Sequence, residues 1–256
     1  MQAFWSSWYW PLATAILGFV YAGLVFRQWL SRRKPHQLAW TVGLLMYAVA
    51  AAMEFYSELT MSWDPTVYRF YIVLAASMVG FLGLGTLYLM AKKRMWGHLY
   101  LAFNLVAIAV FLYGVFNTQL LADQLVAGIT VGGKALGSAT AFPRIMSLFF
   151  NIPGTIFLFG GALLSIYRFS RKTEYAYRMW ANVIIATGTI IIAGAGSMAR
   201  AGTTAGLYPA EMVASALLLW GFLKAGTLHK GVETIKSKHV DRAPTLGAQP
   251  EDREGD

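Results

Sequence analysis

The feature that most constrains the fold is a succession of long apolar runs separated by short polar segments. A helix rises 1.5 Å per residue, so about 20 apolar residues cross the roughly 30 Å hydrocarbon core of a bilayer. Runs of sufficient length occupy residues 11–29, 38–56, 67–91, 97–117, 143–167, 179–199 and 208–228. Because lipid offers no partner to backbone polar groups, such runs predict helices. The expected fold is all-α, a bundle of seven transmembrane helices in one domain, residues 1–228.

Composition supports this fold class and excludes others. Hydrophobic residues make up 57% of the chain and charged residues 13%, whereas soluble domains carry about 25% charged residues. The sequence has no cysteine, which excludes disulfides and thiolate metal sites. The net charge of +9 could suggest nucleic acid, but the basic residues lie in short clusters between apolar runs. Membrane topology explains that pattern, and we expect no nucleic-acid partner.

The basic clusters also predict the orientation, because cytoplasmic loops of membrane proteins carry an excess of Lys and Arg. The chain places one set on one side: Arg27, Arg32, Arg33, Lys34, Lys92, Lys93, Arg94, Arg168, Arg171, Lys172, Arg178, Lys230, Lys236, Lys238, Arg242 and Arg253. The other side holds only Arg69, Lys134, Arg144 and Arg200. We therefore expect a multi-pass protein of the cytoplasmic (inner) membrane, with its N-terminus outside and its C-terminus inside.

Two segments lie outside the predicted spans. Residues 118–142 are too polar and glycine-rich to cross the membrane and too apolar for a free loop, which favours an interfacial helix near 120–127. This connection could cover the outer mouth of the bundle as a lid or rest on headgroups. Residues 229–256 turn from basic to acidic, so we expect a disordered cytoplasmic tail, too short to hold an output domain.

Ionisable residues gather at the outer ends of the predicted spans. A charged residue within the membrane costs about 2.5 to 3.5 kcal/mol and is kept for a partner, a cavity or a function. The candidate ligand-binding residues are Glu54, Glu58, Arg69, Arg144, Arg200 and Glu211, with Tyr71 and Asn151 as hydrogen-bonding groups near the same depth. This outer polar layer is the sequence's main indication of a binding site.

Glu54 and Glu58 are four residues apart and share one helix face. Two like charges there repel each other unless a cation intervenes or one group takes up a proton. Arg69 is the nearest cation in sequence, since the short connection before it makes its span an antiparallel neighbour. An arginine fork can clamp a carboxylate or a phosphate. The alternative is that these charges form structural pairs between helices or snorkel to the interface.

Proline and glycine residues mark places where helices bend or approach. Pro153 removes the hydrogen bond to the Phe149 carbonyl, so the fifth span should kink there, either opening a pocket or making an ordinary bend. Glycines within the apolar spans indicate close helix packing. This set comprises Gly80, Gly83, Gly85, Gly160, Gly161, Gly188, Gly194 and Gly196.

Several functions are not favoured by the residues present. The four histidines His36, His98, His229 and His239 all fall on the predicted cytoplasmic side, which argues against a haem or zinc site in the bundle. Lys224 lies near the cytoplasmic end of the last run and the third run has no acidic counter-ion, which argues against retinal. No catalytic triad, P-loop or dinucleotide motif is present. We expect no metal, no cofactor and no catalytic residue.

Three stretches carry a resemblance to known proteins. They are RQWLSRRKPHQLAWTVGLLMYAVAAAMEFYSE (27–58), YRFYIVLAASMVGFLGLGTLYLM (68–90) and NIPGTIFLFGGALLSIYRF (151–169). Together they resemble a bacterial family of seven-helix integral membrane proteins, which implies a fold and no activity. In layout, the second and third spans are also similar to seven-helix sensor domains of bacterial histidine kinases, although no kinase follows here.

The residues therefore favour a stand-alone membrane sensor or ligand-binding protein. Its outer charged layer would take a small anionic or zwitterionic molecule or a lipid headgroup, with arginines holding the anion and glutamates orienting them or meeting a cationic group. Two alternatives remain open: a small-molecule or proton-coupled transporter titrating at Glu54 and Glu58, and a structural subunit of a membrane complex. Expected partners are membrane lipids, a small-molecule ligand, a cytoplasmic or membrane protein, and a second copy in a homo-oligomer.

Overall fold

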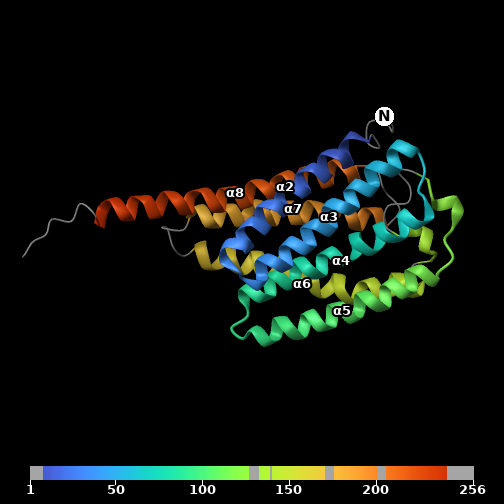
Figure 1. Ribbon diagram of the computed structural model, residues 1–256, viewed down its shortest axis with the longest axis horizontal. Coiled ribbons are helices and arrows are strands. Elements are labelled where there is room, and N and C mark those ends of the chain that lie inside the picture. The colour runs from blue at the N-terminus through green and yellow to red at the C-terminus, as the bar shows by residue number, and fades with distance from the viewer. Residues whose placement is uncertain (1–7, 127–132, 139, 171–175, 201–205, 241–256) are drawn as a thin grey trace, which may run out of the picture.

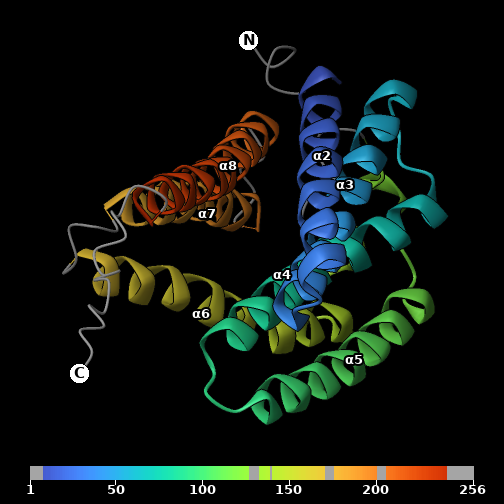
Figure 2. The same ribbon diagram turned by 60° about the vertical axis from the view of Figure 1, so that its left-hand side comes forward.

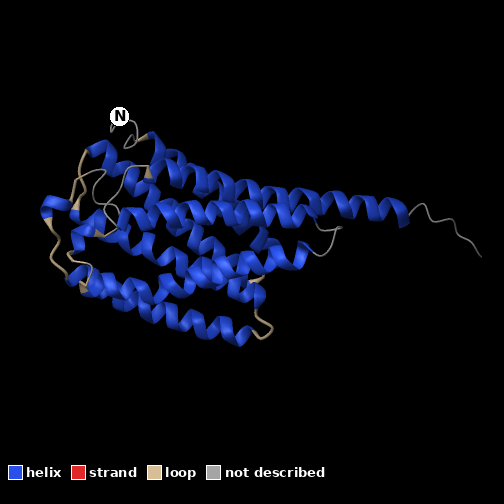
Figure 3. Cartoon of the chain, turned by 180° about the vertical axis from the view of Figure 1, so that it is seen from behind, coloured by secondary structure: helices blue, strands red, loops and turns tan. Residues whose placement is uncertain are grey.

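The computed structural model describes residues 8–126, 133–138, 140–170, 176–200 and 206–240, with backbone alone at 168–170, 176–179, 182, 193, 196–200 and 225–240. This part of the chain is all-α and contains seven α-helices and two 3-10 turns (Figures 1 and 3). Their bounds are α2 Tyr9–Arg32, α3 Pro35–Thr60, α4 Pro65–Met90, α5 Arg94–Asn117, η1 Ala122–Gln124, η2 Lys134–Leu136, α6 Phe142–Ser170, α7 Ala176–Arg200 and α8 Leu207–Val240.

Five of these helices are long and apolar enough to cross a membrane: α2, α3, α4, α5 and the Phe142–Tyr167 part of α6. Large apolar side chains on these helices face outward, among them Ile16, Phe19, Leu105 and Val106. Such an exposed apolar surface is unusual for a soluble protein and normal for one that faces lipid. The chain is therefore built as a multi-pass helical membrane protein. The described part of α7 has a shorter apolar stretch, Val183–Ile192.

Local sequence accounts for the ends of α3 and α4. Each begins with proline at its first position, Pro35 and Pro65, where the missing N–H is harmless. Asp64 caps α4, because its Oδ1 accepts hydrogen bonds from the backbone N–H of Thr66 (2.8 Å) and Val67 (3.0 Å). Met61 ends α3 in the left-handed conformation. A tight turn therefore makes α3 and α4 antiparallel neighbours, as predicted.

Six helices form a ring, and the seventh lies outside it. Around the ring, neighbouring contacts run α2, α3, α4, α6, α7, α8 and back to α2, while α5 packs outside against α4 and α6 (Figure 2). The order of packing therefore departs from the order of the chain at α5. As a result the first, second and last helices, α2, α3 and α8, come together.

Glycines permit the closest helix contacts. A Cβ at Gly83 of α4 would lie 2.5 Å from the backbone of Gly154 in α6, so these backbones touch. Added Cβ atoms at Gly80, Gly85, Gly161 and Gly188 would also meet neighbouring atoms, which confirms their predicted packing role. The prediction was wrong at Gly160 and Gly194, where an added Cβ would meet nothing within 4 Å. The side chain position of Gly196 lies outside the described residues.

α6 continues through Pro153 as one helix, and the next residue, Gly154, makes the close contact with α4. Two expectations about irregular segments need correction. The predicted interfacial helix at 120–127 is only the 3-10 turn η1, whose flanking backbone pairs with Trp63 and Ala135 instead. α8 runs to Val240, so the first part of the predicted tail 229–256 is helical, and residues 241–256 lie outside the described residues.

Candidate functional site

The candidate site is built on the last two turns of α3, which carry Glu54 and Glu58. Both glutamates are buried, with 3% and 6% of their surface exposed. They lie at the end of the bundle where α8 begins and where Leu120, Leu125, Ala135 and Leu136 of the connection between α5 and α6 pack against the core. A carboxylate removed from water in this way needs hydrogen-bond donors.

Tyrosines from two other helices supply those donors. The Tyr71 hydroxyl of α4 donates to Oε1 of Glu54 over 2.8 Å, and the Tyr208 hydroxyl of α8 donates to Oε1 of Glu58 over 2.7 Å. Both tyrosines are buried. Hydrogen bonds to ionised groups are about twice as strong as neutral ones, so each glutamate is tied to a different neighbour of α3. The structure therefore brings together Tyr71 and Glu54, two of the candidate residues.

Glu211 of α8 completes the cluster. Its carboxyl group lies within hydrogen-bonding reach of the carboxyl group of Glu54. An ionised carboxylate can only accept hydrogen bonds, so this contact requires a proton on one of the two groups. Such a proton belongs to the pair and not to either residue alone. We call Glu54 and Glu211 the carboxyl pair.

A second polar link lies two helical turns deeper. The Tyr47 hydroxyl of α3 lies 2.7 Å from Oγ of Ser215 and 3.2 Å from the backbone oxygen of Glu211. Ser215 Oγ donates to the same Glu211 oxygen over 2.7 Å. α3 and α8 are therefore joined by polar side chains at three levels: Tyr47 with Ser215, Glu54 with Glu211, and Glu58 with Tyr208.

Aromatic rings cover the carboxyl pair on the side of α4. Trp63, in the turn before α4, lies with its ring centroid 4.6 Å from that of Tyr71 and 5.7 Å from that of Tyr68. Ala135 and Leu136 of η2 pack in the same cluster. Because this covering is apolar, charges beneath it interact more strongly than they would in water.

Arg69 does not lie between the two glutamates, contrary to the sequence expectation. Its guanidinium donates to the backbone oxygens of Val115 and Thr118, the latter over 2.8 Å, and lies 5.8 Å from the Phe116 ring. These oxygens belong to the end of α5, where carbonyl groups lack helical partners. Arg69 therefore closes the end of α5. The expectation failed because α5 packs on the other side of α4.

Arg144 and Asn151 bond elsewhere than at the carboxyl pair. Arg144 donates to the backbone oxygen of Gly137 over 2.9 Å and ties α6 to the connection before it. Asn151 donates to the Ser147 oxygen of its own helix over 2.8 Å. Arg200 is the last residue of α7, and its side chain lies outside the described residues. Of the eight candidates, the structure thus gathers Glu54, Glu58, Tyr71 and Glu211.

Sequence reasoning missed Tyr47 and Ser215. Tyr47 lies seven residues before Glu54 and therefore on the same helix face, and Ser215 lies four residues after Glu211. These spacings could have been read from the sequence. The contact between α3 and α8 could not, because the two helices are far apart in the chain. Among the described residues, no group of three or more His, Asp or Glu side chains could hold a metal ion. The arrangement can bind and release a proton at a contact between two helices.

Comparisons with known proteins give no relative from which a role for this site could be inferred. No family model matches the chain, and no curated protein or solved structure matches it either.

Proposed function

We propose that all seven α-helices cross the membrane, with the N-terminus outside and the end of α8 in the cytoplasm. The lengths of α7 and α8, 25 and 34 residues, are sufficient for a crossing. The basic residues follow the ends of α2, α4, α6 and α8, which lie together at one end of the bundle (Figure 1). This charge asymmetry supports the cytoplasmic membrane as the location, with the carboxyl pair near the outer face.

We propose further that the protein is a membrane sensor whose outer site binds a proton at the carboxyl pair. The close approach of the carboxyl groups of Glu54 and Glu211 carries this proposal, because two such groups can hydrogen-bond to each other only while one of them holds a proton. Loss of that proton leaves two negative charges in contact beneath an apolar cover. Charges about 4 Å apart repel by about 4 kcal/mol at the effective dielectric of a partly buried site. The pair therefore favours contact of α3 and α8 when protonated and their separation when not.

α8 is the element through which a change in the contact of α3 with α8 could be transmitted across the membrane. It is a single helix of 34 residues and, at 1.5 Å per residue, is about 51 Å long. Figure 1 shows it extending past the other helices at the end opposite the carboxyl pair. A shift of its outer end would reach the cytoplasmic side through a rigid element. A partner protein that docks on the basic cytoplasmic loops would then read the change.

The side chains at this site favour fewer kinds of ligand than the sequence suggested. Arg69 and Arg144 donate hydrogen bonds to backbone oxygens, and the side chains that gather at the site are carboxyl and tyrosine groups. Such a lining suits a proton or the cationic part of a zwitterionic molecule better than an isolated anion. Binding of an anion at Arg69, Arg144 and Arg200 remains a prediction that the proposed function does not require.

A proton-coupled transporter is the second candidate, and the same observation favours it. A buried carboxyl pair that exchanges a proton could couple that exchange to movement of a solute. Proteoliposomes containing a pH-sensitive dye separate the two functions. A sensor leaves the internal pH unchanged under an imposed gradient, whereas a transporter produces a flux that Glu54→Gln abolishes.

Infrared difference spectroscopy of the purified protein during a pH jump tests the shared proton. We expect a carboxylic acid C=O band that disappears as the pH rises in the wild type and is missing from both Glu54→Gln and Glu211→Gln. Asp123→Asn is the control, since Asp123 is exposed and accepts a hydrogen bond from the side chain of Gln124. A band that persists in both glutamine variants would refute the proposal.

A further inference from the structure

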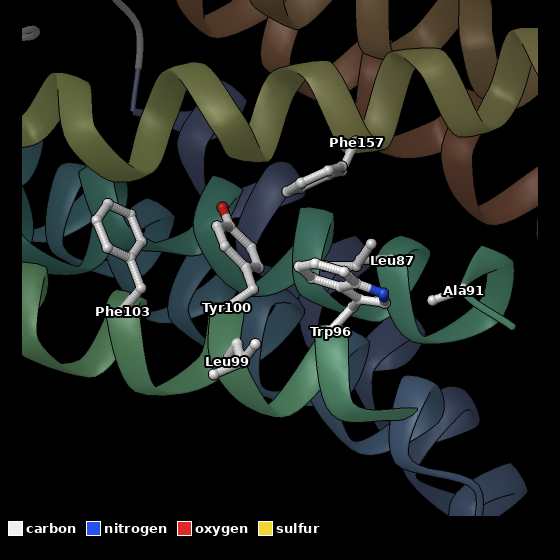
Figure 4. A pocket seen from close by; sticks show the side chains of 7 residues that line it. All are labelled: Leu87, Ala91, Trp96, Leu99, Tyr100, Phe103 and Phe157. Carbon is white, nitrogen blue, oxygen red and sulfur yellow. The ribbon is translucent and has the colours of Figure 1, made fainter. Parts of the chain in front are cut away.

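An apolar groove lies at the other end of the bundle, far from the carboxyl pair. It encloses about 520 Å³ between the end of α4, the start of α5 and the middle of α6 (Figure 4). Its wall includes Leu87, Trp96, Leu99, Tyr100, Phe103 and Phe157. Five of these six side chains present no hydroxyl or charge, so the groove suits a hydrocarbon chain.

Beside the groove, α5 makes close contacts with α4 and with α6. Gly97 lets the start of α5 lie directly against the Tyr88 ring of α4. On the other side, Phe157 of α6 meets Tyr100 edge-on, with centroids 4.9 Å apart. The space beside these contacts is open to the surroundings, since Trp96 is 57% exposed and Leu99 54%. An acyl chain from the bilayer can therefore enter from the side.

Positive charges stand at the mouth of this groove. Lys92, Lys93 and Arg94 are consecutive and exposed, and they follow Ala91, which also lines the groove. The next turn of α5 contains Trp96 and His98, and Nδ1 of His98 lies 2.9 Å from the hydroxyl oxygen of Tyr88 in α4. Trp and Tyr are enriched at membrane interfaces. The apolar groove and the basic residues are thus adjacent along the chain.

We propose that this groove binds an anionic phospholipid. One acyl chain would lie along Phe157 and Trp96, and the phosphate would be held by Lys92, Lys93 and Arg94. The charge of the rim selects an anionic over a zwitterionic lipid, because basic residues near a membrane surface attract anionic headgroups. This site is independent of the carboxyl pair and of the proposed proton response.

Tryptophan quenching by brominated lipids tests the site in the full-length protein reconstituted into vesicles. Brominated phosphatidylglycerol and brominated phosphatidylcholine are compared, and the Trp96→Phe variant isolates the signal of Trp96. Each basic residue near the surface strengthens binding of an anionic headgroup about fivefold. We expect phosphatidylglycerol to occupy the site in preference to phosphatidylcholine by about tenfold or more.

Two variants separate the headgroup contact from the chain contact. Replacing Lys92, Lys93 and Arg94 together by Gln should remove the preference for phosphatidylglycerol. Replacing the basic cluster 32–34 at the end of α2 by Gln removes three charges as well, and it should leave the preference intact. Ala91→Phe should lower the preference without changing charge, because the ring fills the groove. Equal quenching by the two lipids overturns the proposal. So does a preference that survives Ala91→Phe or falls equally in both triple variants.

Discussion

Substituting alanine for glycine at two positions of α6 should give opposite effects on stability. At Gly154, an added Cβ would lie 2.5 Å from the backbone oxygen of Val79 and 3.0 Å from the nitrogen of Gly80. At Gly160, less than two turns further along the same helix, an added Cβ would meet nothing within 4 Å. The same chemical change therefore tests the contact of α4 with α6 against a matched control.

The magnitude follows from this geometry. Ordinary contact begins at 3.4 Å, so Gly154→Ala would force α4 and α6 apart by roughly 1 Å in a close-packed region. Overpacking of this kind costs about 1 to 3 kcal/mol. Both substitutions share the gain in helix propensity of Ala over Gly, about 1 kcal/mol. We expect Gly154→Ala to lower the free energy of unfolding and Gly160→Ala to leave it unchanged or raise it slightly.

Unfolding in mixed micelles of dodecyl maltoside and dodecyl sulfate, followed by circular dichroism, measures this difference. The account predicts a free energy of unfolding about 1 to 3 kcal/mol lower for Gly154→Ala than for Gly160→Ala. Equal values for the two variants would mean that the close approach of α4 and α6 at Gly83 and Gly154 does not exist. The ring of helices described above would then be wrong where α4 meets α6.

Three further outcomes are expected. Asp64→Ala removes the cap of α4 and should cost about 1 kcal/mol in the same unfolding assay, while Asp64→Asn keeps a capping oxygen and should cost little; equal losses would contradict the capping role. Arg69→Gln should destabilise the protein by about 2 kcal/mol through lost charged hydrogen bonds, without altering its response to pH; an altered response would return Arg69 to the site. In the wild type the folded pair holds a proton that a glutamate in the unfolded chain has already lost above about pH 4.3, so stability should fall as the pH rises above that value. Glu211→Gln should flatten that dependence, and an unchanged slope would place the proton elsewhere.

Much of the fold could be predicted from sequence because the thickness of the membrane fixes how long each apolar helix must be. Apolar runs near 20 residues gave the helices, and Pro35, Pro65 and Asp64 mark helix starts by their backbone chemistry. The gathering of acidic groups at one depth followed from counting along those helices. These features depend on residues close together in the chain.

The direction in which side chains point could not be predicted. Arg69 and Glu54 lie at a similar depth, yet they face different neighbours because α5 leaves the ring and packs outside it. The pairing of Glu54 with Glu211 joins helices far apart in the chain. The sequence suggested repulsion between Glu54 and Glu58, whereas the structure places the carboxyl group of Glu54 against that of Glu211, where a shared proton can hold the two together. The sequence therefore indicated which residue types the site would contain, but not which of them would be in contact.

Distance measurement between spin labels on α3 and α8 tests the central claim most directly. Because the chain contains no cysteine, Leu59→Cys and Val213→Cys, at exposed positions of α3 and α8, can be labelled without a background signal. We expect the distance between the labels to increase as the pH rises in the wild type and to stay fixed when Glu211→Gln is added. A distance independent of pH, or an equal change in the Glu211→Gln background, would contradict a proton-controlled contact between these helices.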